Sequence, residues 1–364
     1  MKLPSPPERS FASDNAAGAH PAVLAAIAEA NTGHALAYGA DRWTGECAGR
    51  FAELFGRGET LLTFTGTGAN IVGLMAMLRP VDAVVCAAGA HINVDEAGAA
   101  ERIVGAKLID LPAPDGKLVP EQLAEVAPLL GNEHHVQPAA VSITQPTELG
   151  TLYTAEEVAA LCDRAHAMGM RVHMDGARIA NAVAALSPSR QLAVSTLRSL
   201  TVDAGVDVLS FGGTKNGVLG AEAVIFLDTD LADRASYLRK SVTQLASKMR
   251  FLAAQFLALL DDDLWFDNAA VANAMAASLH DLVADVPGLG VAVPAVNSLF
   301  PTLARPAAAA LQQWSFFWEW DPLPGTDRCQ VRWMTSWDTT AADVDRFAAG
   351  VTSATLASPA GSLT

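Results

Sequence analysis

Short apolar runs alternate with longer amphipathic stretches along the first two thirds of the chain. The runs have the length and composition of strands buried on both faces, and the stretches have the spacing of helices. The predicted strands lie at residues 61–64, 82–86, 106–111, 139–144, 171–174, 206–211 and 221–227. The predicted helices lie at residues 21–31, 44–55, 71–78, 120–130, 154–168 and 178–185, with a connection over 187–204. This alternation predicts an α/β domain with a mostly parallel, doubly wound sheet.

The last third of the chain has a different pattern. A long helical stretch over residues 230–262 and a second helix at 268–286 precede a Pro-Gly break. Strand-like segments at 291–293, 299–303, 316–320 and 330–335 follow, with a final helix from about 341. We therefore expect an N-terminal arm (residues 1–20), a large domain (21–262) and a small C-terminal α+β domain (263–364).

The composition argues against several classes of protein, namely nucleic-acid-binding, membrane and secreted proteins. The chain has 364 residues, 51% of them hydrophobic, and a net charge of −15 at pH 7, which argues against a nucleic-acid or anionic-membrane surface. The Pro-rich start has no apolar segment, so we expect no signal peptide, and no apolar run approaches the length of a membrane span. The four cysteines are far apart and form no zinc or disulfide pattern, so we expect a cytoplasmic setting.

The segment Thr65–Asn70 joins a predicted strand to a predicted helix and consists of small residues. Backbone N–H groups at such a helix start, together with the helix dipole, form an anion site. The spacing of Gly66, Gly68 and Gly73 is not that of a dinucleotide-binding loop, and no P-loop lysine follows. A phosphate monoester therefore fits better than a dinucleotide, and a tight turn without a ligand is the alternative.

Two predicted strands end next to reactive groups, Asp175 and Lys215. Because strand ends meet at one edge of an open α/β sheet, this acid and this lysine could share one site. Pyridoxal phosphate (PLP) catalysis needs such a pair, since a lysine forms the Schiff base and a carboxylate keeps the pyridine nitrogen protonated. Taken singly, Asp175 could be a helix cap and Lys215 a solvated loop residue.

Two further positions carry candidate chemistry. His91 also follows a strand, so it is either a buried structural histidine or an imidazole stacked on a planar cofactor. Arg332 is a cation among apolar strand residues and needs a partner, either Asp338 or Glu319 or a substrate carboxylate. The pair at 134–135 is His-His, but no third ligand has a useful spacing, so we expect no metal.

The order of these motifs resembles that of the threonine aldolase family, which has the aspartate-aminotransferase fold of PLP enzymes (fold type I). The resemblance covers about residues 11–350. It rests on Ser13-Asp14-Asn15, Gly18-Ala19-His20-Pro21, Tyr38-Gly39-x-Asp41, Gly66–Asn70, Ala90-His91, Pro146–Gly150, His173–Arg178, Ser210–Gly217, Val331-Arg332 and Ser336-Trp337. The motifs around Asp175 and Lys215 are the specific ones.

The resemblance implies a PLP-dependent aldolase that cleaves a β-hydroxy-α-amino acid, such as threonine, allo-threonine or phenylserine, to glycine and an aldehyde. Lys215 would be the Schiff-base lysine, Asp175 the partner of the pyridine nitrogen and His91 the residue stacked on the ring. Many relatives carry a second histidine where this chain has Thr147-Glu148. The general base is therefore His91, a water that it holds, or Glu148.

The resemblance also implies the binding residues and the assembly. The cofactor would be bound by Gly66, Thr67, Gly68, His91, Asp175, Arg178, Thr214 and Lys215. The substrate would be bound by Ser13, Tyr38, Arg178 and Arg332. A homodimer or homotetramer with the site near a subunit interface is expected. The alternatives are another fold-type-I enzyme, namely a β-eliminating lyase or an aminotransferase, and a non-catalytic protein of the same fold.

Overall fold

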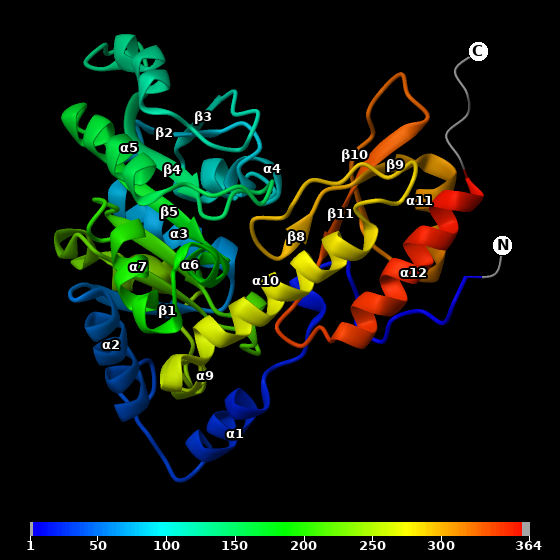
Figure 1. Ribbon diagram of the computed structural model, residues 1–364. Coiled ribbons are helices and arrows are strands. Elements are labelled where there is room, and N and C mark those ends of the chain that lie inside the picture. The colour runs from blue at the N-terminus through cyan, green and yellow to red at the C-terminus, as the bar shows by residue number, and fades with distance from the viewer. Residues whose placement is uncertain (1–2, 359–364) are drawn as a thin grey trace. The chain divides into compact units, whose positions relative to one another are not determined.

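The computed structural model describes residues 3–358 and consists of two compact units. The large unit comprises Ala19–Trp265. The small unit comprises residues 3–18 together with 266–358, so the two ends of the chain belong to the same unit. Figure 1 shows the elements of both units, and each unit is described separately.

The large unit is built on a seven-stranded sheet with the order β1-β7-β6-β5-β4-β2-β3. Its strands are β1 (Glu59–Thr63), β2 (Asp82–Ala87), β3 (Lys107–Leu111), β4 (Gln137–Thr144), β5 (Arg171–Gly176), β6 (Val208–Gly212) and β7 (Glu222–Phe226). The strands from β6 to β3 pair in parallel, whereas β7 is antiparallel to both β6 and β1. Residues 213–221 between β6 and β7 are too few for the crossover that parallel pairing needs. The predicted mostly parallel sheet is confirmed.

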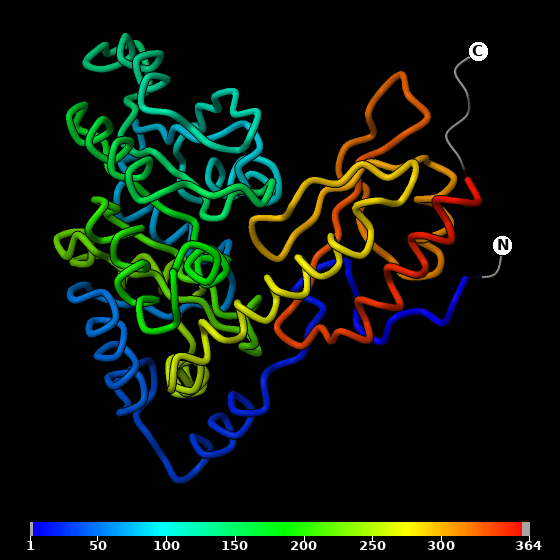
Figure 2. The backbone as a smooth tube through the Cα atoms, viewed as in Figure 1, coloured from blue at the N-terminus to red at the C-terminus, as the bar shows by residue number. Residues whose placement is uncertain are grey.

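Helices precede, connect and follow these strands, as the course of the chain in Figure 2 shows. They are α1 (Pro21–Ala30), α2 (Arg42–Phe55), α3 (Gly66–Met77), α4 (His91–Val94), α5 (Ala155–Ala167), α6 (Ile179–Leu186), α7 (Ala193–Leu200), α8 (Ala235–Ser241) and α9 (Arg250–Leu260). Helix α5 begins at the capping box that the sequence predicted, in which the Thr154 hydroxyl accepts from the Glu157 N–H at 3.2 Å.

Three segments of the large unit differ from the prediction. Residues 120–130 form two 3₁₀ turns, Pro120–Glu125 and Ala127–Leu129, because Pro128 has no N–H to donate and disfavours a helical residue before it. The connection over 187–204 contains α7, whose Leu197 and Leu200 are buried. The stretch 230–262 is not one helix, since it is interrupted at Thr243, where φ is 65°.

The small unit contains an antiparallel sheet in which β11 (Arg328–Met334) pairs with three strands. These are β8 (Ser298–Leu299), β9 (Thr302–Ala304) and β10 (Trp318–Asp321). Its helices are α10 (Leu264–Val283), α11 (Arg305–Trp314) and α12 (Ala341–Ala357). The N-terminal segment contributes Phe11 to the core, where its ring stacks on Phe347 with centroids 4.1 Å apart.

The prediction was also incomplete in the small unit. Helix α11 was missed, and residues 291–293 form no strand. The predicted strand at 299–303 is split into β8 and β9 on either side of Phe300 and Pro301. Pro301 cannot donate to the ladder, which explains the interruption.

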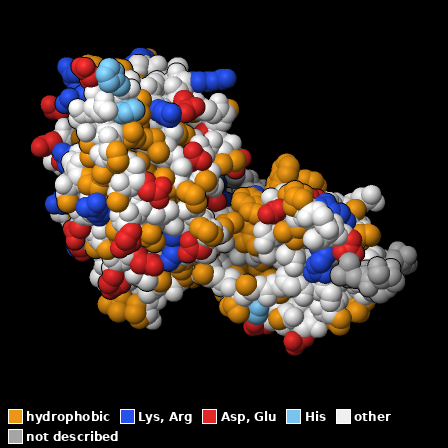
Figure 3. All heavy atoms as spheres, turned by 90° about the horizontal axis from the view of Figure 1, so that it is seen from above, with side chains coloured by type: hydrophobic (Ala, Val, Ile, Leu, Met, Phe, Trp, Pro, Cys, Tyr) orange, Lys and Arg blue, Asp and Glu red, His pale blue; other side chains and the backbone are white. Residues whose placement is uncertain are grey.

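The surface is mixed in character. Figure 3 shows acidic and basic side chains interspersed with apolar ones over the face in view. Among residues 3–358, no helix combines the length and the apolar character needed to cross a membrane.

Candidate active site

A cavity lies at the carboxyl ends of β2, β4, β5 and β6 in the large unit. Parallel strands end at the same edge of the sheet, so residues far apart in the sequence meet there. The cavity brings together the following residues singled out from the sequence: Gly66, Thr67, His91, Glu148, Asp175, Arg178 and Lys215.

The turn that carries Lys215 lies directly against the turn that follows Asp175. A Cβ atom at Gly212, the last residue of β6, would collide with the backbone carbonyl of Ala177. Only glycine permits this close approach of two backbones. Gly212 therefore has a structural function, since it allows the two reactive strand ends to adjoin.

Asp175 is buried, with 5% of its surface exposed, and two donors hold its carboxylate. Oδ2 accepts from Nδ2 of Asn70 at 2.8 Å, and Oδ1 accepts from the N–H of Ala177 at 3.0 Å. Burial acts to raise the pKa of Asp175, but the Asn70 hydrogen bond and the charge of Lys215 outweigh it and lower the pKa below its ordinary value. Asp175 is therefore an anion at neutral pH and can stabilise a cationic group placed against it.

His91 is the first residue of α4, and its imidazole contacts a buried acid. Nδ1 lies 2.9 Å from Oε1 of Glu96, whose side chain is 1% exposed. The hydrogen bond from Glu96 raises the pKa of His91 and outweighs burial, which lowers it, while Asp175 adds to the increase and Lys215 opposes it. His91 therefore changes its protonation state above the pH at which a solvated histidine does.

Glu148 lies in the loop after β4 and is linked directly to His91. Its Oε1 accepts from the backbone N–H of His91 and from the hydroxyl of Thr144, each at 2.8 Å. Burial raises the pKa of Glu148, although both hydrogen bonds lower it. Glu148 thus orients the backbone of the segment that carries the imidazole.

The predicted anion site lies at the N-terminus of α3. This helix begins at Gly66 and not at Ile71, because the hydroxyl of Thr65 accepts from the N–H of Gly68 at 3.0 Å and caps the first turn. The N–H groups of Gly66 and Thr67 are in the first helical turn and have no intrahelical acceptor. They are the donors available to an anion at this end of the cavity.

Five predicted residues are not among those that line this cavity. Gly68 lies in the first turn of α3, where its N–H donates to the hydroxyl of Thr65. Tyr38 is 54% exposed, with a φ of 61° and Nζ of Lys240 4.9 Å from its ring centroid. Thr214 lies in the turn immediately before Lys215. Ser13 and Arg332 belong to the small unit.

The local surroundings of Ser13 and Arg332 are defined within the small unit. The hydroxyl of Ser13 accepts from the N–H of Asn15 at 3.2 Å. The guanidinium carbon of Arg332 lies 4.9 Å from the centroid of the Trp320 ring. The two acids weighed as its partners form other ion pairs: Asp338 with Arg9 at 3.5 Å and Glu319 with Arg305 at 3.2 Å.

Two further residues of the site, Asn70 and Glu96, were not predicted from the sequence. Asn70 closes the small-residue segment at the start of α3, and its side-chain amide bonds to both Asp175 and Glu96. Glu96 lies 5 positions after His91 in the sequence, just beyond the end of α4. Both residues lie close to motifs that were recognised in the sequence, and this was the one signal that could have found them. An Asn or a Glu by itself does not indicate a residue that supports a catalytic acid or histidine.

Ligand atoms of His91, Glu96 and Asp175 lie within 4.8 Å of one another, a spacing at which they could hold a metal ion. Hydrogen bonds already connect these atoms: His91 to Glu96, and Asn70 to both acids. A cation would compete with the amide of Asn70 for the same carboxylate oxygens. The arrangement therefore corresponds to a polar network built around a donor amide.

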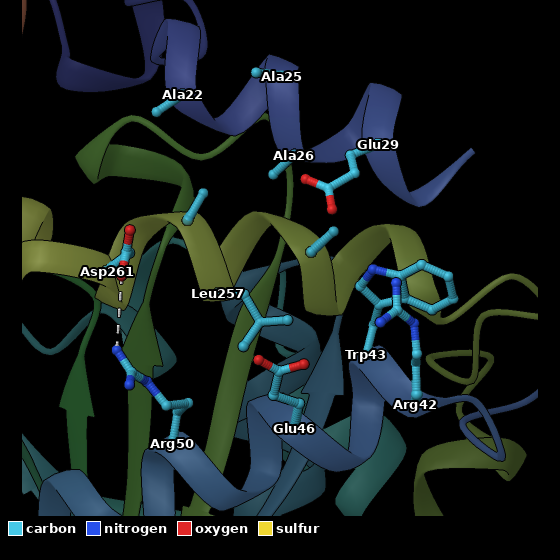
Figure 4. Close-up of a pocket in the computed structure, with 12 residues that line it drawn as sticks. Ala22, Ala25, Ala26, Glu29, Arg42, Trp43, Glu46, Arg50, Leu257 and Asp261 are labelled. Atoms are coloured by element: carbon cyan, nitrogen blue, oxygen red, sulfur yellow. Dashed lines mark ion pairs between the residues drawn. The ribbon is translucent and has the colours of Figure 1, made fainter. Parts of the chain in front are cut away.

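A second cavity of about 560 Å³ lies between α1, α2 and α9. Figure 4 shows Ala22, Ala25 and Ala26 along one side of it, and an ion pair between Arg50 and Asp261, 4.0 Å apart. None of the residues predicted from the sequence to be catalytic lines it. The strand-end cavity, which combines an ionised acid, a lysine and an imidazole, is the candidate active site.

Comparison with known proteins identifies relatives over almost the whole chain. The model of the β-eliminating lyase family matches residues 10–306. The chain is 40% identical over 348 residues to the low-specificity L-threonine aldolase of Pseudomonas sp. (strain NCIMB 10558), an alignment that covers 94% of this chain and 97% of that protein. It is 41% identical over 343 residues to the low-specificity L-threonine aldolase of Pseudomonas aeruginosa, covering 93% and 94% of the two chains.

A solved structure agrees with these sequence relatives. The structure of Leishmania major threonine aldolase superposes with a TM-score of 0.86 at 32% sequence identity. The superposition covers 94% of this chain and 98% of that one. The similarity therefore extends over both units of the fold.

Proposed function

This chain belongs to the β-eliminating lyase family and, within it, to the low-specificity L-threonine aldolases, and from that premise we propose how its residues cleave a β-hydroxy-α-amino acid. It is a PLP-dependent lyase of fold type I. Its reaction splits the Cα–Cβ bond of L-threonine and releases glycine and acetaldehyde. Allo-threonine and phenylserine are further substrates in this proposal.

One observation carries the assignment of the site: the ionised, buried Asp175 lines the same cavity as Lys215 and the start of α3. These groups fit PLP. The amine of Lys215 would bind the aldehyde of the cofactor covalently, and Asp175 would pair with the pyridine nitrogen. The phosphate would be bound by the N–H groups of Gly66 and Thr67. His91, Gly68, Arg178 and Thr214 would complete the binding site.

When bound, PLP supplies an electron sink that stabilises the carbanion formed at Cα. Asp175 keeps that sink effective, because its negative charge favours the protonated pyridine nitrogen. The two hydrogen bonds on its carboxylate, from Asn70 and Ala177, fix the acid in place and keep it ionised. No reorganisation of the acid is then needed during the reaction.

We assign the removal of the β-hydroxyl proton to His91. Its neutral imidazole accepts this proton as the Cα–Cβ bond breaks, directly or through a bound water. The raised pKa of His91 strengthens it as a base near neutral pH. Glu148, whose carboxylate already accepts two hydrogen bonds, has a supporting function and holds the His91 backbone.

Three residues are proposed to bind the substrate carboxylate: Ser13, Arg178 and Arg332. The planar guanidinium of an arginine can grip a carboxylate with two parallel hydrogen bonds.

Product analysis of the purified holoenzyme tests the proposed function. Incubation with L-threonine should yield glycine and acetaldehyde in equal amounts, and the Lys215→Ala variant should yield neither. That variant should also lack the visible absorption band of cofactor bound to a lysine. Parallel reactions with L-allo-threonine and phenylserine show whether the enzyme accepts the other configuration at Cβ and a substrate that releases an aromatic aldehyde. A keto acid as the main product would contradict the proposal and point to β-elimination or transamination.

We further propose that the protein is a homodimer or homotetramer with Tyr38 near the subunit contact. Several large apolar side chains of the large unit are at least 44% exposed, namely Leu24, Leu36, Tyr38, Phe64 and Leu219. Apolar surface of this kind is typical of faces covered by a partner. Tyr38 is proposed to contact the substrate of a neighbouring subunit, because it does not line the cavity of its own chain. Light scattering after size exclusion measures the mass of the assembly.

A cytoplasmic setting is also proposed. The cysteines Cys47, Cys86, Cys162 and Cys329 are all free thiols and buried. Burial raises the pKa of Cys86 and of Cys162 to about 12, which keeps both thiols protonated and unreactive. Fractionation of cells that produce the protein tests this assignment.

A further inference from the structure

Glu96 is the buried acid behind His91. It follows helix α4, and the chain turns sharply after it, since Ala97 has a φ of 53° and Gly98 a φ of 72°. Ala97 thus adopts a left-handed conformation that residues with a side chain rarely adopt. The N–H of Ala99 donates to the carbonyl of Glu96 at 2.9 Å and closes this turn. The backbone is therefore shaped so that the Glu96 side chain lies inside the protein.

The carboxylate of Glu96 connects the imidazole to the acid on the neighbouring strand end. Its Oε1 lies 2.9 Å from Nδ1 of His91 and accepts from Nδ2 of Asn70 at 2.9 Å. The same Nδ2 donates to Oδ2 of Asp175 at 2.8 Å. One amide group thus bridges two carboxylates, and three of these four residues are buried.

The chemistry of these groups determines where the protons are. An ionised carboxylate only accepts hydrogen bonds, so Nδ1 of His91 must carry the hydrogen that faces Glu96. In the neutral imidazole, Nε2 is then the acceptor nitrogen. The amide of Asn70 is oriented in the same way, because its NH₂ group has to face both acids. The network therefore selects one of the two tautomers of His91.

Four charged or titratable groups act on His91 from different elements. Glu96 contacts the ring, Asp175 lies at the end of β5, and Glu148 in the loop after β4 bonds to the His91 N–H. Asp175 raises the pKa of His91, whereas the positive charge of Lys215, in the turn after β6, lowers it. Only Glu96 makes a direct hydrogen bond to the ring among the described residues, so it dominates the protonation of His91.

We propose that Glu96 is a positioning residue of the aldol cleavage, which holds His91 in the tautomer that accepts the β-hydroxyl proton at Nε2. The proposal rests on the function proposed above. During cleavage the O–H bond breaks and the proton bonds to Nε2. The electron pair of the O–H bond forms the aldehyde carbonyl as the Cα–Cβ bond breaks, and the electron pair of the Cα–Cβ bond stays on Cα, which is later protonated to give glycine. The imidazole becomes an imidazolium, and the carboxylate of Glu96 compensates its new positive charge. The Asn70 amide donates a hydrogen bond to each carboxylate. Glu96 can therefore compensate the charge of the imidazolium, while Asp175 compensates that of the pyridine nitrogen.

Nuclear magnetic resonance of the holoenzyme, labelled with ¹⁵N-histidine, tests this without any substrate. The signals of His91 are assigned by their loss in His91→Phe. We expect neutral His91 to carry its hydrogen on Nδ1 and to titrate above 6.5, its ordinary pKa. In Glu96→Gln, which keeps the size and a side-chain oxygen but removes the negative charge, the pKa of His91 should fall. Because no turnover is needed, this result is independent of which substrate the enzyme cleaves.

Kinetics of the same variants provide the second readout. Glu96→Gln should move the acid limb of the kcat/KM profile to lower pH, in step with the measured His91 pKa. It should lower kcat by more than 10-fold, but by less than the roughly 10²–10⁴-fold expected for loss of the base itself. Glu96→Asp retains the charge and should restore most of the pKa and of the rate. Glu101→Gln, an exposed acid on the same segment, is the matched control and should change neither.

Two results would overturn the proposal. In the first, His91 has the same pKa and tautomer in Glu96→Gln as in the wild type, which would make Glu96 a structural residue only. In the second, the pKa falls but the acid limb stays where it was, which would show that His91 is not the group that Glu96 positions for catalysis. If Glu96→Gln does not fold, the wild-type spectra decide the matter, because a His91 pKa at or below 6.5, or a hydrogen on Nε2 of the neutral ring, would refute the proposal. Absence of aldol cleavage in the wild type would instead refute the proposed function.

Discussion

Oε1 of Glu148 accepts a hydrogen bond from the backbone N–H of His91 at 2.8 Å. The two residues that sequence reasoning weighed as the general base are therefore parts of one structure. A change at Glu148 can displace His91, so loss of activity in a Glu148 variant does not by itself identify the base. The pH dependence of each variant is more informative than its rate.

His91→Phe should remove the acid limb of the pH–rate profile. The base must be neutral, so the rate falls as the pH decreases through the pKa of His91, which the hydrogen bond to Glu96 raises. Phenylalanine keeps a planar ring but cannot accept a proton, and kcat should fall by about 10²–10⁴-fold. Glu148→Gln keeps an oxygen to accept from the His91 N–H and should retain the limb. If only Glu148→Gln flattens it, the base is Glu148.

Asp175→Asn should leave PLP bound but slow the reaction. A neutral amide does not stabilise the positive charge on the pyridine nitrogen, so the electron sink is weaker. We expect kcat to fall far more than KM changes, because the affected interaction matters most in the transition state. Steady-state kinetics and the absorption spectrum of the bound cofactor measure the two effects. An unchanged kcat would show that Asp175 only caps the turn at Ala177.

Arg332→Lys should raise KM more than it lowers kcat. Lysine keeps the charge but loses the planar fork that binds a carboxylate through two hydrogen bonds. Arg305→Lys is a matched control in the same unit, since Arg305 pairs with Glu319 at 3.2 Å. A lower Tm for Arg332→Lys with little kinetic change would assign Arg332 a structural function, such as packing over Trp320.

Glu222→Gln should change the pH dependence of stability. Glu222 is buried, its Oε2 accepts from the Gly213 N–H at 2.9 Å, and burial raises its pKa from 4.5 to about 6. The folded state then binds the proton of Glu222 more tightly than the unfolded state does. The stability that protonated Glu222 contributes is therefore fully present below pH 4.5 and is lost as the pH rises through about 6. A difference of 1.5 units corresponds to about 2 kcal/mol, at 1.36 kcal/mol per unit.

Glutamine resembles the protonated form of Glu222 but cannot ionise, so the Glu222→Gln variant should not lose this stability as the pH rises. Urea unfolding of the holoenzyme at several pH values should therefore show the variant more stable than wild type at pH 7 by up to about 2 kcal/mol, with little difference near pH 4.5. The exposed Glu121→Gln is the control and should follow the wild type. A constant difference between Glu222→Gln and wild type across this range would show that the carboxyl group does not titrate as inferred.

The sequence by itself determined the strands of the large sheet and the motifs at their ends. Apolar runs and small-residue turns are local signals, and a parallel sheet brings its strand ends to one edge whatever the details of the helices. The amino-acid sequence therefore predicted that His91, Asp175 and Lys215 lie at neighbouring strand ends, and all three line one cavity. Helix boundaries were less accurate where prolines or a single positive φ interrupt an otherwise helical pattern, as at Pro128 and Thr243.

Only the tertiary structure decided how these residues are supported. Asn70 is separated from Asp175 by 105 positions and from Glu96 by 26, yet one amide group bonds to both. Such a contact depends on how α3 lies beside the strand ends and on the sharp turn at Ala97, and no local pattern encodes either. A buried carboxylate is recognised by its surroundings and not by its residue type, because its charge is tolerated only where donors happen to converge.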